Sequence, residues 1–196
     1  MFGRSVRATG EEACRPLPGD ELIPQSIASL THAATVRRPP SDVWPWLAQM
    51  GAGNRAGWYS YDLVDNGGRP SAGHIVPELQ RLSASMVFPA LPDRTDGFVL
   101  VAFEPERFLI LGWRSPNGTL LVTWAFVLHE MNNRSTRLIV RARASRGYQF
   151  HRLPWWLARR VVRLVHFVMQ RKQLLGIARR AESAATMLPQ CDKGAA

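Results

Sequence analysis

Aromatic and ionisable side chains gather in one short stretch of this sequence. The segment "RAGWYSYDLVDN" (55–66) places Trp58, Tyr61 and Asp62 close together, directly after a glycine-rich turn. A wall of aromatic rings with one polar group is the usual lining of a small-molecule pocket. The same residues also suit a structural corner, in which tyrosine hydroxyls bond the backbone and Asp62 caps a turn. Both interpretations stay open on the sequence.

A second group of residues could move protons. His74 and Glu78 are four positions apart, a spacing that places two side chains on one face of a helix. With Asp62 they are the candidates for acid–base work. An exposed ion pair or a capping interaction is the commoner role of such a pair. The sequence therefore does not decide whether the protein is an enzyme.

The sequence has no motif for dinucleotide binding, for a cysteine metal site or for a histidine metal site. The "GAGNRAG" turn (51–57) follows a predicted helix and not a strand, so it does not fit a dinucleotide-binding loop. Cys14 and Cys191 have no CxxC partner and are expected to be free thiols. No metal site is expected, because metal-ligand spacing is absent among the histidines at 32, 74, 129, 151 and 166. We expect a function that needs no cofactor.

The composition suits one globular domain with an unusual charge. The chain has 196 residues, of which 46% are hydrophobic and 20% charged. Its net charge of +10 attracts anionic ligands or surfaces. The arginines are scattered, which favours a solvated basic surface, then an anionic membrane face, over a nucleic-acid partner. Without a signal-peptide pattern or an apolar span of membrane length, a cytoplasmic location is predicted.

Hydrophobic periodicity predicts the elements that position these residues. A first strand over 26–38 is followed by a helix in "PPSDVWPWLAQMG" (39–51), with Ser41 as its N-cap. Five strand-like runs between 86 and 145 are separated by short turn-rich segments, which predicts consecutive antiparallel hairpins. In the last run Arg137, Arg141 and Arg143 alternate with apolar residues. This alternation predicts a sheet with one covered face and one wet face.

A long helix from about Pro154 to Ala185 is expected to cover that sheet. Its predicted buried stripe is apolar and comprises Leu157, Val161, Leu164, Val165, Val168 and Leu175. The opposite, predicted wet side comprises Arg159, Arg163, His166, Gln170 and Gln173. Near its start "RLPWWLARR" pairs Trp155 and Trp156 with arginines, which suits either an interfacial membrane contact or packing on the sheet rim.

These elements predict an α+β architecture in which a curved antiparallel sheet and one helix enclose a hydrophobic cavity. Trp113, Trp124, Phe126 and Met169 fall on faces that should look into the interior. We expect an irregular N-terminal lead (1–25), a single domain (26–187) and a flexible tail (188–196).

The sequence resembles the START-like, Bet v 1-like (SRPBCC) superfamily, in its polyketide cyclase/dehydrase and lipid-transport-like branch. The resemblance rests on "RPLPGDELIP", "RRPPSDVWPWLAQMG", "GWYSYDLVDN", "HIVPELQ", "TWAFVLHE" and "HFVMQRKQLLGIARRAE". It implies a helix-grip fold, with about seven antiparallel strands around the C-terminal helix and a deep hydrophobic cavity. One departure is Ser83-Ala84-Ser85, where similar proteins carry a Gly-Asp turn.

The expected function is binding of a small lipid-like or polycyclic molecule in the cavity. The expected ligand-binding residues are Trp58, Tyr61, Asp62, Trp113, Trp124, Phe126 and Met169. One alternative is a polyketide cyclase or dehydratase-like enzyme that uses the same cavity. A second alternative is a peripheral protein that binds anionic membranes through Arg159, Arg160 and Arg163. The ligand and the oligomeric state are not predicted.

Overall fold

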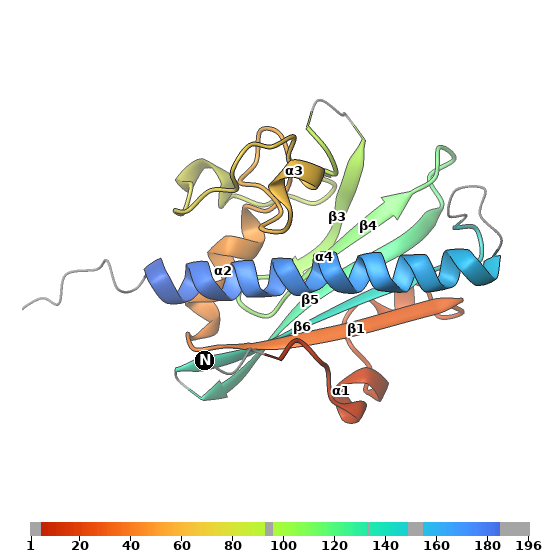
Figure 1. Ribbon diagram of the computed structural model, residues 1–196, viewed down its shortest axis with the longest axis horizontal. Coiled ribbons are helices and arrows are strands. Elements are labelled where there is room, and N and C mark those ends of the chain that lie inside the picture. The colour runs from red at the N-terminus through yellow and green to blue at the C-terminus, as the bar shows by residue number, and fades with distance from the viewer. Residues whose placement is uncertain (1–4, 93–95, 133, 149–154, 185–196) are drawn as a thin grey trace, which may run out of the picture.

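A six-stranded antiparallel sheet curves around one long helix (Figure 1). The structure is a computed structural model that describes residues 5–92, 96–132, 134–148 and 155–184. Its helix, α4, spans Trp155–Ala184. In sequence order the strands are β1 (Ala28–Val36), β2 (Val87–Pro89), β3 (Gly97–Glu104), β4 (Phe108–Arg114), β5 (Leu120–Asn132) and β6 (Ser135–Ala144). The predicted α+β class and C-terminal helix are confirmed, with six strands in the described chain where about seven were expected.

The strand order β1-β6-β5-β4-β3-β2 combines a meander with one long return. Strands β2 to β6 follow one another as hairpin neighbours, as the short separators predicted. Strand β1 pairs with β6 along its full length, from Ala28 opposite Ala144 to Val36 opposite Thr136. Three short helices fill the connection between β1 and β2: α2 (Pro40–Ala48), α3 (Asp62–Asp65) and the 3₁₀ helix η2 (Pro77–Leu79).

The start of α2 differs from the prediction. The helix begins at Pro40 with Pro39 as its N-cap, and no side chain caps it, so the expected role of Ser41 is wrong. Proline at the first helical position is already fixed at a helical φ and lacks only a donor that would be unpaired there. The backbone of the two prolines therefore sets this helix start.

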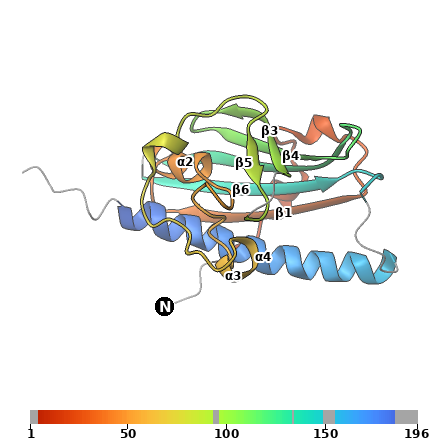
Figure 2. The same ribbon diagram turned by 90° about the horizontal axis from the view of Figure 1, so that it is seen from above.

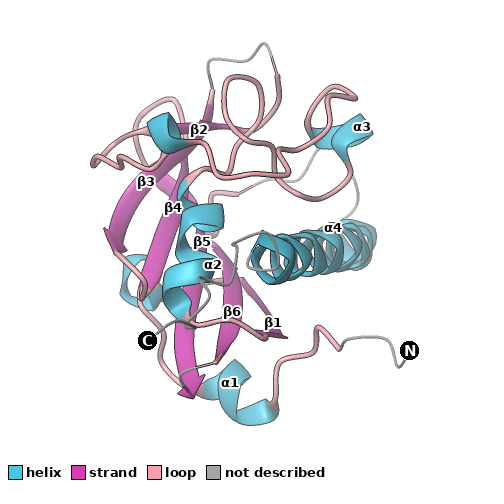
Figure 3. Cartoon of the chain, turned by 90° about the vertical axis from the view of Figure 1, so that its left-hand side faces the viewer, coloured by secondary structure: helices cyan, strands magenta, loops and turns pink. Residues whose placement is uncertain are grey.

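The main hydrophobic core lies between the concave face of the sheet, α2 and α4. Trp46 of α2, Phe126 of β5, Leu138 of β6 and Ile177 of α4 are almost completely buried in it. Figure 3 shows α4 end-on, on one side of the sheet. The core thus holds together the elements that carry the predicted site.

The convex face of the sheet is partly covered as well, so the expectation of a single covered side is wrong. The N-terminal lead contains a helix, α1 (Gly10–Cys14), whose start is fixed by a capping box between Thr9 and Glu12. Leu17 of this lead packs into a second apolar cluster with Ala33, Ile110, Ala125, Val127 and Ile139. Alternation in a strand shows which residues share a face, but not whether another segment lies on that face.

The arginines predicted to be wet hold this lead in place. Arg141 is only 3% exposed and forms an ion pair with Asp20, with Nη1 2.5 Å from the carboxylate. It also donates hydrogen bonds to the backbone carbonyls of Glu12, Ala13 and Arg15. Arg137 binds both carboxylate oxygens of Glu12, at 2.7 and 2.9 Å. These side chains are buried because the lead satisfies their donors.

The long helix has the expected bounds, but the face that it turns to the sheet differs from the predicted one. Leu175 packs against the core and Arg163 is exposed, as predicted, whereas other positions are reversed. The predicted buried stripe is exposed at Leu164 (64%), Val165 (51%) and Val168 (39%). Gln170 and Gln173, predicted to be wet, are each 2% exposed and lie on the inward face with Leu174, Ile177, Ala178 and Ala181. Buried amides are tolerated because they bond each other and Trp124. The side chain of Leu157 lies outside the described residues.

Candidate ligand-binding site

A rigid loop after α2 carries the aromatic stretch. Gly51 and Gly57 pair through two backbone hydrogen bonds of 3.2 and 2.7 Å. Arg55 folds back and donates to the carbonyls of Ala48 and Met50, which satisfies the end of α2. Gly57 has a φ of +85°, and a Cβ there would overlap Ser71. The loop can therefore adopt only a narrow set of positions against its neighbours.

Trp58 points into the concave side of the sheet. It is 4% exposed, its Nε1 donates to the carbonyl of Pro89 at 3.2 Å, and its ring stacks on Trp124 with centroids 5.4 Å apart. Tyr61 points the other way and is 41% exposed. The aromatic stretch is thus divided between the interior and the surface.

Asp62 is the first residue of α3, and its hydrogen bonds hold the loop that follows it. Its carboxylate accepts hydrogen bonds from the backbone N–H of Ser71, at 3.1 Å, and from the Ser71 hydroxyl. Its backbone carbonyl accepts from Asn66 and Gly68. Asp62 therefore ties the two ends of the 62–71 loop together.

The aromatic residues of β3, β4 and β5 form a continuous cluster with Trp58. Phe98 contacts Trp113 and Trp124, each with ring centroids 5.3 Å apart, and Trp124 contacts Phe126 at 4.9 Å. Phe126 is fully buried, whereas Phe98, Trp113 and Trp124 are half-buried. The strand pairing places all of these side chains on the concave face. We call Phe98, Trp113 and Trp124 the aromatic wall.

The inward face of α4 adds polar groups beside this wall. Gln170 accepts a hydrogen bond from Trp124 Nε1 at 2.9 Å and donates to Gln173 Oε1 at 2.8 Å. Among the described residues, the acceptor for Gln173 Nε2 is the weakly accepting sulfur of Met50, at 3.7 Å. Met169, predicted as a ligand contact, is half-buried, and its carbonyl accepts from the hydroxyl of Ser60 at 3.1 Å.

His74 and Glu78 do not share a helical face, because η2 covers only Pro77–Leu79 and His74 precedes it. Both side chains are exposed. The His74 carbonyl, and not its imidazole, has a structural role, accepting from Gln49 Nε2 at 3.0 Å. The expected geometry for an acid–base pair is therefore wrong.

Two other histidines meet between the sheet and α4. His32 of β1 and His166 of α4 stack with centroids 5.4 Å apart. His32 Nε2 and His166 Nδ1 have no hydrogen-bond partner among the residues that the structure describes. Burial, together with the nearby His32, lowers the pKa of His166 to about 4. Burial also lowers the pKa of His32, so both rings are neutral near pH 7. Within the described part of the chain, no three His, Cys, Asp or Glu residues are placed to hold a metal ion.

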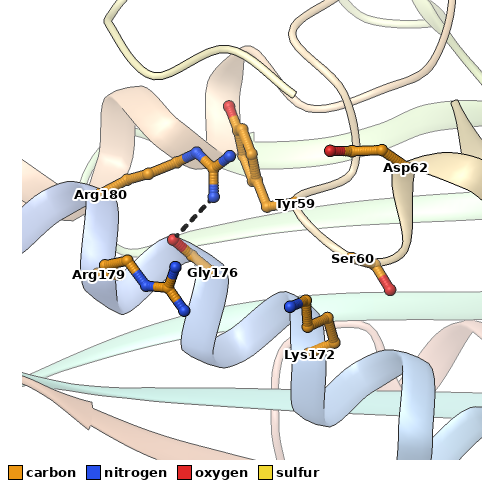
Figure 4. A pocket seen from close by; sticks show the side chains of 7 residues that line it. All are labelled: Tyr59, Ser60, Asp62, Lys172, Gly176, Arg179 and Arg180. Carbon is orange, nitrogen blue, oxygen red and sulfur yellow. Dashed lines mark hydrogen bonds between the residues drawn. The ribbon is translucent and has the colours of Figure 1, made fainter. Parts of the chain in front are cut away.

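A polar pocket that the sequence did not indicate lies between the loop and α4 (Figure 4). It has a volume of about 180 Å³ and is lined by Tyr59, Ser60, Asp62, Lys172, Gly176, Arg179 and Arg180. The two halves of this lining are more than a hundred residues apart in sequence. The spacing of Lys172, Gly176 and Arg180 by four was the one available signal, since it places them on one helix face.

Comparisons with known proteins identify the fold. No known protein-family profile matches the sequence, and no curated protein matches it. Among solved structures, the Polyketide_cyc-like protein Cgl2372 of Corynebacterium glutamicum matches with a TM-score of 0.50 and 14% identity, over 87% of this chain and 100% of its own.

Two further solved structures are similar at lower scores. Protein MLL2253 of Mesorhizobium loti has a TM-score of 0.47 and 14% identity, over 80% of this chain and 98% of its own. The Zhui aromatase/cyclase of Streptomyces sp. R1128 has a TM-score of 0.42 and 11% identity, over 81% of this chain and 95% of its own.

The chain is therefore an α+β protein of the helix-grip class. Its fold is similar to that of the Polyketide_cyc-like protein Cgl2372 and agrees with the helix-grip fold that the sequence resemblance implied. Among the described residues, no helix combines the length and the apolar character that crossing a bilayer requires.

Proposed function

We propose that the protein binds a small hydrophobic molecule against the aromatic wall, on the inner side of α4. The observation that carries this proposal is the partial exposure of Phe98, Trp113 and Trp124 on the concave face, where neighbouring residues are fully buried. Burial of apolar surface contributes ~25 cal/mol per Å². A flat apolar ligand that covers these rings would gain most of its affinity in this way.

The inward amides supply a polar contact for the same ligand. Gln170 is hydrogen-bonded to Trp124 and Gln173, whereas within the described chain the N–H groups of Gln173 have only a thioether acceptor. An acceptor on the ligand, such as a carbonyl or hydroxyl oxygen, would pair with Gln173 better than the sulfur does. Trp58 supports the wall through its stacking on Trp124. Tyr61 is exposed, so Gln173 replaces it as the proposed orienting group.

The shared fold supports this class of ligand. The matched Corynebacterium protein is described as Polyketide_cyc-like, and a polyketide-type or lipid-like molecule has the large apolar surface that the aromatic wall would cover. The cytoplasmic location and the single domain over 26–187 belong to the same proposal.

Ligand binding is tested first by native mass spectrometry of gently purified protein, followed by organic-solvent extraction. A co-purifying hydrophobic compound would support the proposal and identify the ligand class. The protein is then titrated with this compound, or with a lipid and polyketide panel, and binding is monitored by tryptophan fluorescence. Protein that carries no co-purifying compound and responds to no compound in the titration would overturn the proposal.

A pair of tryptophan variants locates the binding surface. Trp113→Leu removes a ring of the aromatic wall and should weaken binding roughly tenfold, because about 1.4 kcal/mol of contact is lost. Trp44→Leu is the matched control, since Trp44 is also half-buried but stacks on Phe103 outside the wall. Equal effects of the two substitutions would contradict a site at the wall.

An enzymatic role is the alternative. The exposed positions of His74 and Glu78, and the loop-tying contacts of Asp62, favour binding over turnover. Asp62→Asn and Glu78→Gln should abolish turnover in a cyclase-like enzyme, but leave the affinity of a binding protein within about threefold. Loss of product formation in either variant would favour the enzyme.

The membrane alternative rests on the start of α4. Arg163 is exposed there, as expected. The side chains of Trp155, Trp156, Arg159 and Arg160 lie outside the described residues. Salt-sensitive binding to anionic liposomes that weakens when these arginines are neutralised remains its test.

A further inference from the structure

The polar pocket between the loop and α4 has an excess of positive charge. Lys172, Arg179 and Arg180 line it from the helix, and Asp62 is its single carboxylate. The pocket shares no lining residue with the aromatic wall, because the wall lies on β3, β4 and β5 and the pocket is lined by the loop and α4. Figure 4 shows Lys172 and Arg179 on α4 with Gly176 between them, and Ser60 and Asp62 across from the helix.

Arg180 is held in place before any ligand arrives. Its guanidinium donates to the carbonyls of Ala72 at 2.8 Å, Ser71 at 3.2 Å and Gly176 at 3.3 Å. It also lies over the ring of Tyr59, 4.7 Å from the centroid. A guanidinium has five N–H donors, so these bonds fix its plane and leave donors for a ligand. Preorganisation of this kind lowers the entropic cost of binding.

Lys172 and Arg179 have no acidic partner in the described chain. Neither residue is among the arginines that form ion pairs with carboxylates elsewhere in the described chain, such as Arg38, Arg137 and Arg141. Lys172 instead lies over the exposed ring of Tyr61, with Nζ 5.6 Å from its centroid. The positive charge of these two residues is therefore available to an anion.

The single carboxylate does not neutralise this charge. Asp62 accepts two hydrogen bonds from Ser71, one from the backbone N–H and one from the hydroxyl. Three cations against one carboxylate leave the pocket with two net positive charges. A dianion would balance it.

We propose that this pocket binds the phosphate group of an organic phosphate. A phosphate monoester carries a charge of about −1.5 to −2 at pH 7 and has three strong acceptor oxygens, which match the donors of Lys172, Arg179 and Arg180. The volume of about 180 Å³ accommodates the phosphate and the first atoms of its substituent.

The surroundings suggest that the substituent is at least partly apolar. Leu63 and Val64 of α3 are 85% and 64% exposed, and Val168, one turn before Lys172, is also exposed. Figure 2 shows α3 beside the middle of α4. Two sources supply such a phosphate, a soluble ester and the headgroup of a phospholipid. Both sources share the chemistry that the three cations recognise.

The test uses the full chain and isothermal titration with glycerol 3-phosphate at low salt. The double variant Lys172→Gln/Arg179→Gln should bind at least roughly tenfold more weakly than the wild type, because two charge-assisted contacts are lost. Arg171→Gln is the matched control, since Arg171 is an exposed cation on the same helix that does not line the pocket. It should change affinity by less than about twofold.

A second measurement distinguishes the two sources. Co-sedimentation with phosphatidic acid vesicles and with phosphatidylcholine vesicles is compared for the same three proteins. Binding only to phosphatidic acid, lost in the double variant but not in Arg171→Gln, would assign the site to a lipid headgroup. Binding of glycerol 3-phosphate without vesicle binding would assign it to a soluble ester.

The proposal is overturned if neither probe binds, or if Arg171→Gln reduces binding as much as the double variant. The latter result would mean diffuse attraction by the net charge. Because both cations are exposed, the variants should keep the wild-type melting temperature, which is measured in parallel. Trp113→Leu should leave phosphate binding unchanged, so this test is independent of the proposed hydrophobic ligand.

Discussion

Gly176 of α4 lies against the backbone of Tyr59, with no room for a side chain between them. A Cβ at Gly176 would overlap the carbonyl oxygen of Tyr59 and would lie 3.0 Å from its Cβ. Tyr59 itself has a φ of +59°, which a non-glycine residue adopts only under constraint. This contact sets the loop on the helix, and with it both the polar pocket and the inward direction of Trp58.

Substitution of Gly176 should therefore destabilise the protein. Gly176→Ala forces either the loop or α4 to move and should lower the free energy of unfolding by about 1–3 kcal/mol, measured by urea denaturation. Gly73→Ala is the control, because a Cβ at Gly73 meets nothing within 4 Å. An equal effect at the two glycines would show that the loop is not fixed by this contact.

Removal of Arg141 should release the N-terminal lead. Arg141→Ala removes the buried ion-pair partner of Asp20, which keeps only Arg143 and the Leu17 N–H among the described residues, and it leaves the carbonyls of Glu12, Ala13 and Arg15 without this donor. The substitution should cost about 3 kcal/mol in the free energy of unfolding. Hydrogen exchange should then accelerate over residues 9–23 first. As a control, Arg107→Ala breaks the exposed pair with Glu104 and should cost less than about 1 kcal/mol. Unchanged exchange in the lead of Arg141→Ala would refute this role.

Stability should fall in acid through His166. The folded pKa is lowered from 6.5 to about 4 by burial and by His32, so between these pH values the unfolded chain binds a proton that the native protein does not. The free energy of unfolding should therefore decrease as the pH falls from 6.5 to 4, by about 3 kcal/mol from this residue.

Asp65 changes the free energy of unfolding in the opposite direction between pH 6 and pH 4. Burial and the neighbouring Asp62 raise the pKa of Asp65 to about 6, so its protonation stabilises the native state as the pH falls below 6. The difference between the wild type and His166→Asn isolates the histidine. Identical pH profiles of the two proteins, from urea denaturation, would contradict the buried neutral imidazole.

The observed orientation of α4 predicts opposite results on its two faces. Leu164→Gln changes an exposed side chain and should alter the free energy of unfolding by less than about 0.5 kcal/mol. Leu174→Gln places an amide in the core and should cost at least about 3 kcal/mol. Thermal and urea unfolding compare the two. The reverse order would mean that the helix faces the sheet as its apolar pattern suggested.

The sequence alone determined the class of the fold. Turn-rich separators and the alternation in residues 118–145 predicted the antiparallel meander, because backbone geometry makes period-two patterning a local property. The same alternation predicted the inward direction of Trp124 and Phe126, and the helical period of the apolar residues predicted the length of the final helix. The members of the aromatic cluster could thus be recognised from the sequence.

Only the tertiary structure decided which surfaces are covered. Gln170 and Gln173 face the core because Trp124 and Met50 lie opposite them, and Arg141 is buried because the N-terminal lead brings Asp20 to it. The polar pocket brings residues 59–62 to residues 172–180. Hydrophobic periodicity cannot encode these outcomes, because whether a polar side chain is buried depends on partners that are distant in the chain.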